Sequence, residues 1–184
     1  IQAIFPGGIG CLTQTKESRE DDLENGWQQL CDKHITKDDI VVGFSASGTT
    51  PFVLSILKHC RKEGIPTGCI VNNPHSPIAE WADYEVEVIT GPEFVTGSTR
   101  MKAGTSQKLI LDMISTTLQI RQGRVEGNKM VNAKLINHKL IDRACRIFME
   151  RNSEYKDYEE VRQLILKAGS VKKAEMMISR HFDM

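Results

Sequence analysis

The fold of this chain is constrained most by a strand pattern at residues 38–44 and by the two segments that follow it. After two aspartates the pattern is continuous, apolar and largely β-branched, as in a strand that is buried on both faces of a parallel sheet. A loop of Ser, Gly and Thr follows at 45–51, and then a helical pattern at 52–63 that Gly64 ends. A strand, a loop and a helix in this order predict one unit of a parallel sheet with right-handed crossovers.

Other segments repeat this alternation of strand and helix. Further strands are predicted at 1–5, 65–71 and 84–89. Further helices are predicted at 18–30, 76–81 and 107–122. From about residue 131 onward only helical patterns occur. We therefore expect an α/β domain at 1–130, with a parallel sheet flanked by helices, and a C-terminal helical region at 131–184.

The composition argues against several classes of protein. Lys+Arg and Asp+Glu both number 24, so the formal net charge is zero, whereas binding to nucleic acid or to an anionic membrane needs a basic excess. The five cysteines are scattered without a CxxC pair, and the histidines lack the spacing of metal ligands. No apolar run is long enough to span a bilayer. We expect free thiols in a reducing cytoplasm, no metal and no membrane segment.

The loop Ser45-Ala-Ser-Gly-Thr-Thr-Pro51 has the composition of an anion-binding site. Ser45, Ser47 and Thr49 offer hydroxyl donors, and the helix that follows offers free N–H groups. Gly48 lets the backbone approach a ligand closely. The loop lacks the Lys of GxxxxGK[ST] and the pattern GxGxxG, so it suits a single phosphate monoester better than a nucleotide with magnesium. An ordinary capped start of a helix is the alternative.

A second loop of this kind lies at 91–105, between the strand at 84–89 and the helix at 107–122. It is rich in Gly and in hydroxyl residues, among them Ser98 and Thr99. Because the carboxyl ends of parallel strands meet at one edge of a sheet, the two loops are expected to lie together. Together they favour a phosphorylated small molecule as the ligand.

The second loop and its helix also carry a resemblance to a known family. Gly91-Pro-Glu-Phe-Val-Thr-Gly-Ser-Thr-Arg-Met-Lys-Ala-Gly-Thr-Ser-Gln-Lys-Leu-Ile-Leu-Asp-Met113 resembles the diagnostic stretch shared by N-acetylmuramic acid 6-phosphate etherases and the glucokinase regulatory protein. Supporting motifs lie at 41–51, 73–77, 127–131 and 137–143. The resemblance covers about residues 1–150 and is closer to the bacterial etherases. It implies a sugar isomerase (SIS) fold, which is flavodoxin-like, with a five-stranded parallel sheet that binds phosphosugars.

The resemblance further implies a carbon–oxygen lyase that works without a metal, a nucleotide or another cofactor. An etherase removes D-lactate from N-acetylmuramic acid 6-phosphate by elimination across C2–C3 and addition of water, which gives N-acetylglucosamine 6-phosphate during cell-wall recycling. Two glutamates serve the family as acid/base groups, and one of them corresponds to Glu20. From the pattern alone, Glu20 belongs to an acidic helix start. Phosphate binding carries over to Ser45, Ser47, Gly48, Thr49, Ser98 and Thr99.

Members of the family carry a further strand, a Gly-Thr-Ser-Gly-Arg loop and the segment with the principal catalytic Glu before the position of Ile1. We therefore expect a fragment, a chain completed by another segment, or a divergent member. The expected partners are a phosphorylated amino sugar and either a second copy, as in a homodimer, or a complementing N-terminal segment. A non-catalytic phosphosugar-binding regulator, like the glucokinase regulatory protein, is an alternative, as is a structural fragment without a ligand.

Overall fold

The computed structural model describes residues 1–14 and 17–182. The chain divides into two compact units, Ile1–Leu111 and Asp112–Met184. The division falls within the long helix α3, Lys102–Arg121. The first unit contains a parallel sheet, and the second contains a short hairpin followed by helices.

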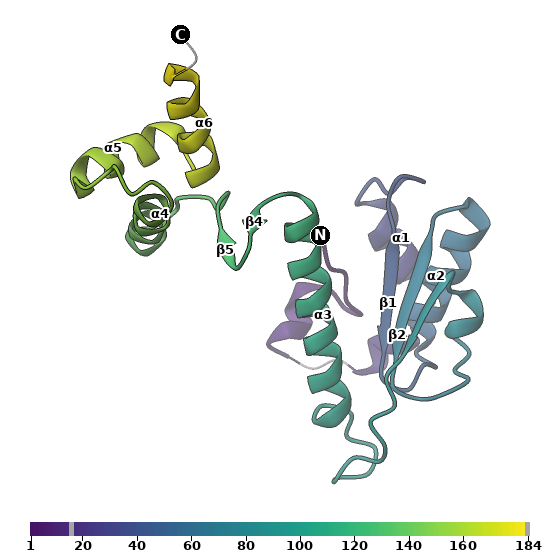
Figure 1. Ribbon diagram of the computed structural model, residues 1–184. Helices are drawn as coiled ribbons and strands as arrows, with labels where there is room; N and C mark the ends of the chain where they lie inside the picture. The colour runs from purple at the N-terminus through teal and green to yellow at the C-terminus, as the bar shows by residue number, and fades with distance from the viewer. Residues whose placement is uncertain (15–16, 183–184) are drawn as a thin grey trace. The chain divides into compact units, whose positions relative to one another are not determined.

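The first unit is built on a parallel sheet, which has three strands in the described residues (Figure 1). The strands are β1 (Val41–Ser45), β2 (Thr67–Val71) and β3 (Tyr84–Glu87), in the spatial order β1-β2-β3. β2 is buried along its whole length, whereas the residues of β3 are exposed, as expected for an edge strand. The predicted fold class, an α/β fold with a parallel sheet flanked by helices, is confirmed.

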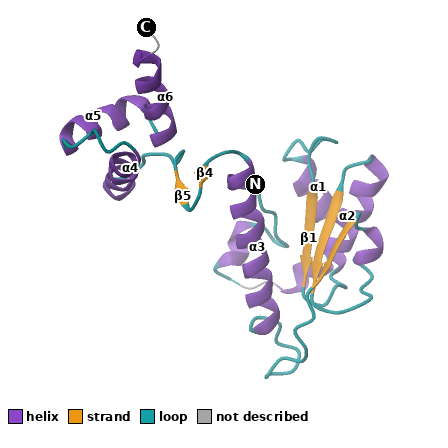
Figure 2. Ribbon diagram, in the orientation of Figure 1, coloured by secondary structure: helices purple, strands orange, loops and turns teal. Residues whose placement is uncertain are grey.

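Helix α2 (Pro51–Glu63) connects the first two strands and lies alongside them (Figure 2). It begins with a proline in its first turn and ends at Gly64, whose φ of 71° is left-handed. One side of α2 packs Phe52 and Ile56 against Leu30 of helix α1 (Asn25–Cys31). Its other side packs Leu57 against the buried side chains of β2. The remaining helical segments of this unit are η1 (Ile9–Leu12), η2 (Glu17–Asp21), η3 (Ala79–Trp81) and the start of α3.

Two expectations for the N-terminal part of the chain are wrong. Residues 1–5 form no strand, and instead the carbonyl of Phe5 accepts a hydrogen bond from Gln29 Nε2 (3.2 Å). The predicted helix at 18–30 is divided into η2 and α1. The cause is Asp22, whose Oδ1 accepts from the backbone N–H groups of Glu24 (3.3 Å) and Asn25 (3.0 Å) and so favours a turn over a continuous helix.

The second unit begins with a hairpin of β4 (Val125–Glu126) and β5 (Lys129–Met130). Sequence reasoning missed it, because strands of two residues carry no alternating pattern. Its two-residue turn contains Gly127, with a φ of 59°. Helices α4 (His138–Arg151), α5 (Tyr158–Ala168) and α6 (Val171–Phe182) follow, as their apolar periodicity predicts. The side chains of Asn137 and Asp157 cap α4 and α5.

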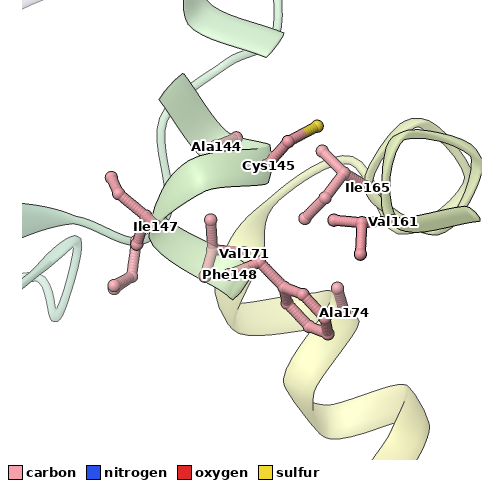
Figure 3. Close-up of a cluster of buried hydrophobic side chains, with 9 residues drawn as sticks. Ala144, Cys145, Ile147, Phe148, Val161, Ile165, Val171 and Ala174 are labelled. Atoms are coloured by element: carbon pink, nitrogen blue, oxygen red, sulfur yellow. The ribbon is translucent and has the colours of Figure 1, made fainter. Parts of the chain in front are cut away.

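The three helices of the second unit share a core of their own. Phe148 of α4 is fully buried and lies among side chains from α5 and α6 (Figure 3). Arg151 binds Glu126 of the hairpin (2.7 Å) and Glu175 of α6 (2.6 Å), and Lys172 also binds Glu126 (3.2 Å). Lys172 and Arg151 hold the pKa of the Glu126 carboxyl below its usual range. The hairpin is therefore fastened to the helices by ion pairs.

None of the helices in the described part of the chain combines the length and apolar character that a membrane span needs.

Candidate functional site

The hydroxyl groups of the loop at 45–50 gather around one another. Ser45 is the last residue of β1, and Thr50 directly precedes α2. Ser45 Oγ lies 2.8 Å from Thr50 Oγ1 and 3.3 Å from Ser47 Oγ. Thr49 Oγ1 donates to Ser47 Oγ at 2.9 Å. The fold thus brings four hydroxyls together at the carboxyl end of β1, where an open α/β sheet binds its ligands.

The backbone of this loop turns its N–H groups toward the same hydroxyls. The Gly48 N–H donates to Ser45 Oγ (3.0 Å), and the Thr49 N–H donates to Ser47 Oγ (3.2 Å). The N-cap residue of α2, Thr50, makes no capping hydrogen bond with its side chain. Hydroxyl groups, loop N–H groups and the positive end of a helix dipole form a site suited to an anion. The predicted candidates Ser45, Ser47, Gly48 and Thr49 lie in one cluster, and their role in phosphate binding stays a prediction.

Gly48 cannot be replaced by another residue without movement of its surroundings. Its φ of 73° lies in the left-handed region. A Cβ atom at this position would stand 2.1 Å from Ser76 Cβ and 2.5 Å from Ser76 Oγ. Ser76 therefore packs directly against the backbone of the loop, in the space that a side chain of residue 48 would need.

The second loop binds a carboxylate of its own at the start of α3. Glu93 Oε2 accepts from the N–H of Lys102 (3.0 Å), and Glu93 Oε1 accepts from the N–H of Ala103 (3.0 Å). These backbone hydrogen bonds hold the pKa of the Glu93 carboxyl below its usual range. The first turn of α3, which the sequence predicts as an anion site, thus already holds the side chain of Glu93. The hydroxyls of Ser98 and Thr99 make no hydrogen bond within the described residues.

Glu93→Gln should lower stability at neutral pH and have less effect in acid. The carboxylate has its lowered pKa only in the folded protein, so its stabilisation is present above the ordinary pKa of Glu and is lost as the pH falls through the folded pKa. Urea denaturation from pH 7 to pH 3 should show the difference between wild type and variant shrinking as the pH falls. Glu154→Gln, at an exposed position, reports the general effect of removing one negative charge. A difference that is constant over this range contradicts the prediction.

Two asparagines at the end of β2 bind the loop at 45–50, and one of them also binds the start of α3. The Asn72 N–H donates to Ala46 O (3.1 Å), and Asn73 Nδ2 donates to the same carbonyl (3.1 Å). The side chain of Asn72 is buried and donates to Val88 O and to Ser106 Oγ, both at 2.8 Å. Its Oδ1 also accepts from the side chain of Gln107 in α3 (3.0 Å). Asn72 therefore fixes the start of α3 relative to the loop at 45–50.

Replacing Asn72 by Ala should destabilise the first unit by about 2 to 4 kcal/mol, because three hydrogen bonds of a buried side chain are lost and their partly buried partners Val88 and Gln107 lose an interaction. Both tryptophans, Trp27 and Trp81, lie in this unit, so urea denaturation followed by tryptophan fluorescence measures its stability. Asn152→Ala, in the second unit, is the control and should leave this transition unchanged. A loss below about 0.5 kcal/mol for Asn72→Ala would show that these bonds have little net value.

Glu20 lies in η2 and is exposed. In the described part of the chain the side chain of Glu20 makes no hydrogen bond or ion pair, so no such contact connects it to either loop. The segment that follows it is held to α2 by Ser55 Oγ, which donates to Leu23 O at 2.5 Å. The catalytic role of Glu20 therefore stays a prediction. Among the described residues there is also no group of three or more His, Cys, Asp or Glu residues that could hold a metal ion.

Sequence reasoning missed four residues that organise this region: Asn72, Asn73, Ser76 and Glu93. The signal available for the first two was their position directly after a buried strand, at the sheet edge where ligands bind. Asn73, Ser76 and Glu93 lie within the stretches at 73–77 and 91–113 that carry the resemblance. The sequence does not show that Glu93 binds the N–H of Ala103 or that Ser76 packs against Gly48.

The arrangement of sheet, loops and helices is that of a sugar-isomerase-type domain, and residues 26–116 match the SIS domain. The N-acetylmuramic acid 6-phosphate etherase of Bacteroides thetaiotaomicron is 51% identical over 181 residues, which are 98% of this chain and 65% of that protein. The etherase of Porphyromonas gingivalis is 51% identical over 94% of this chain and 62% of its own length. That of Bacteroides fragilis is 48% identical over 95% of this chain and 61% of its own length.

The chain therefore belongs to the SIS-domain family of N-acetylmuramic acid 6-phosphate etherases, and the resemblance predicted from the second loop is confirmed. The chain spans slightly less than two thirds of the length of these relatives.

Proposed function

We propose that this chain is the phosphosugar-binding part of an N-acetylmuramic acid 6-phosphate etherase, a carbon–oxygen lyase of cell-wall recycling. The observation that carries the proposal is the hydroxyl cluster of Ser45, Ser47, Thr49 and Thr50 at the N-terminus of α2, in a chain that is 51% identical to such an etherase. No Lys or Arg lies in this loop. Neutral donors at a helix N-terminus suit a monoester phosphate such as that of a 6-phosphosugar.

The reaction consists of an elimination and a hydration. A base removes the proton from C2 of the sugar, the C3–O bond to the lactyl group breaks, and an acid protonates the departing oxygen, which releases D-lactate. Water then adds across the C2–C3 double bond. Carboxyl groups can perform both proton transfers. Glu20 is the candidate in this chain for one of the two roles, and the loops at 45–50 and 91–105 would hold the phosphate.

The proposed function is tested by measuring D-lactate released from N-acetylmuramic acid 6-phosphate. The chain is assayed alone and together with the N-terminal segment that the resemblance places before residue 1, taken from the Bacteroides thetaiotaomicron relative. We expect lactate release in the presence of that segment. Folded protein that releases no lactate in either assay contradicts an etherase activity.

Binding is tested separately from catalysis. N-acetylglucosamine 6-phosphate, the expected product, should raise the unfolding temperature of the chain, whereas N-acetylglucosamine without the phosphate should not. Equal effects of the two sugars contradict phosphate recognition by the loops.

We also propose that the protein is cytoplasmic and that it forms a homodimer or associates with a complementing N-terminal segment. All five cysteines are free thiols, as in proteins of a reducing compartment. Apolar side chains line one face of α3, among them Leu109, Met113 and Ile120, and each is at least half exposed. Such a helix is normally covered by another surface. Sedimentation with and without the N-terminal segment distinguishes the two kinds of partner.

A further inference from the structure

Ser76 has a buried hydroxyl group without a hydrogen-bond partner. The residue is 3% exposed, and its Oγ is the only such side-chain atom found in the described residues. Buried polar groups in folded proteins are nearly always hydrogen-bonded, because an unsatisfied group loses its hydration without compensation. An exception next to a candidate binding site therefore calls for a functional explanation.

The side chain of Ser76 faces the loop at 45–50. Its Oγ lies 2.5 Å from the point where a Cβ of Gly48 would stand, so no side chain separates it from the backbone of the loop. The other hydroxyls of this region, those of Ser45, Ser47, Thr49 and Thr50, all have partners within the loop. Among the described hydroxyls at the loop at 45–50, only that of Ser76 is buried and without a partner.

The segment that carries Ser76 is bound to the loop on both sides of this contact. The Asn72 N–H donates to Ala46 O (3.1 Å), and the Ile78 N–H donates to Gly48 O (3.1 Å). Ser76 is thereby held in register with Gly48. The environment of Ser76 results from contacts made in the tertiary structure. Ser76 therefore differs from a surface serine that happens to lie near a loop.

We propose that Ser76 is a further residue of the phosphate site, and that its hydroxyl donates to an oxygen of the phosphate group held by the loop at 45–50. For the phosphate to reach the Ser76 hydroxyl, the backbone at Gly48 has to move slightly. Gly48 has no side chain, so few conformational barriers oppose this movement. A hydrogen bond to a charged oxygen is stronger than one to a neutral group, so binding of the ligand offsets the cost of the unpartnered hydroxyl. The inference rests on the proposed binding of a phosphosugar.

Two variants of Ser76 test the proposal, with N-acetylglucosamine 6-phosphate and inorganic phosphate as ligands. Ser76→Ala removes the unpartnered hydroxyl, so the protein without added ligand should unfold at a higher urea concentration than wild type. The same variant should bind N-acetylglucosamine 6-phosphate about tenfold or more weakly in isothermal titration. Ser76→Cys fills the space of the hydroxyl with a weak donor and should weaken binding similarly.

Ser170→Ala is the matched control. Ser170 is also a buried serine, but its Oγ accepts a hydrogen bond from the Lys173 N–H (3.3 Å) and lies in the second unit. This variant should be less stable than wild type and bind the ligand with unchanged affinity.

The possible outcomes separate this proposal from the proposed function. If wild type binds the phosphosugar and Ser76→Ala binds it equally well, the role of Ser76 is excluded while the proposed function stands. A Ser76→Ala protein that is less stable than wild type without ligand also overturns the proposal, because the hydroxyl would then have a structural partner. If Ser76→Cys retains full affinity, packing rather than hydrogen bonding explains the residue. A wild-type protein that binds neither ligand contradicts both proposals.

Discussion

Gly48→Ala should abolish phosphosugar binding and destabilise the first unit by about 2 to 5 kcal/mol. The left-handed φ of 73° costs a residue with a Cβ about 1 to 2 kcal/mol. Overpacking adds a further 1 to 3 kcal/mol or so, because the new Cβ would stand 2.1 Å from Ser76 Cβ. Relief of this clash displaces the loop whose hydroxyls form the site. Tryptophan fluorescence in urea measures the stability, and isothermal titration with N-acetylglucosamine 6-phosphate measures the binding.

Gly64→Ala separates the effect of backbone conformation from that of the clash. Gly64 has a similar, left-handed φ of 71°, but a Cβ there meets only the end of the Lys37 side chain, at an ordinary contact distance of 3.7 Å. This control should lose only the conformational contribution of about 1 to 2 kcal/mol and should bind the ligand normally. Equal losses of stability in the two variants, with binding retained in both, would show that Ser76 and Gly48 are not tightly packed.

Glu20→Gln should reduce the rate of lactate release by about 10²- to 10⁴-fold, which is the usual contribution of a positioned acid or base. Because Glu20 is exposed and makes no hydrogen bond within the described residues, the substitution should not change stability measurably. Affinity for N-acetylglucosamine 6-phosphate should also be retained, since the phosphate is held elsewhere. The rate is measured with the N-terminal segment of the relative present.

Glu24→Gln is the control for this substitution. Glu24 is an exposed carboxylate in the same acidic segment and should be replaceable with little loss of activity. If Glu20→Gln retains a rate within tenfold of wild type, the residue has no acid/base role.

Much of this protein could be predicted from local sequence. The strand within the run at 38–44, the glycine after α2 and the periodicity of α4 to α6 were predicted from consecutive residues. The expected burial of this strand on both faces is wrong, because β1 lies at an edge of the described sheet and Val42 is 36% exposed. The resemblance at 91–113 identified the family, because a long specific stretch carries information that composition lacks. The loop at 45–51 was recognised as a candidate site because hydroxyls, glycine and a helix start follow one another directly along the chain.

Other features depend on particular side-chain contacts and could not be predicted from the pattern of residue types. Asp22 interrupts the helical pattern at 18–30 through a competing hydrogen bond, which propensity alone does not reveal. The first turn of α3 is bound by Glu93, nine residues before Lys102. Residues 1–5 have a strand pattern, but they pair with no strand in the described chain, and the pattern alone does not reveal this.

The sequence by itself determined the fold class, the family and the composition of the loop at 45–51, since each of these depends on residues that follow one another along the chain. Only the tertiary structure decided that Asn72 connects the loop at 45–50 with the start of α3 and that Ser76 lies against Gly48 with a buried, unpartnered hydroxyl. The physical reason is that hydrogen bonding and burial are properties of pairs of groups in space. A serine at position 76 acquires its significance only when folding places it beside a glycine 28 positions earlier in the chain.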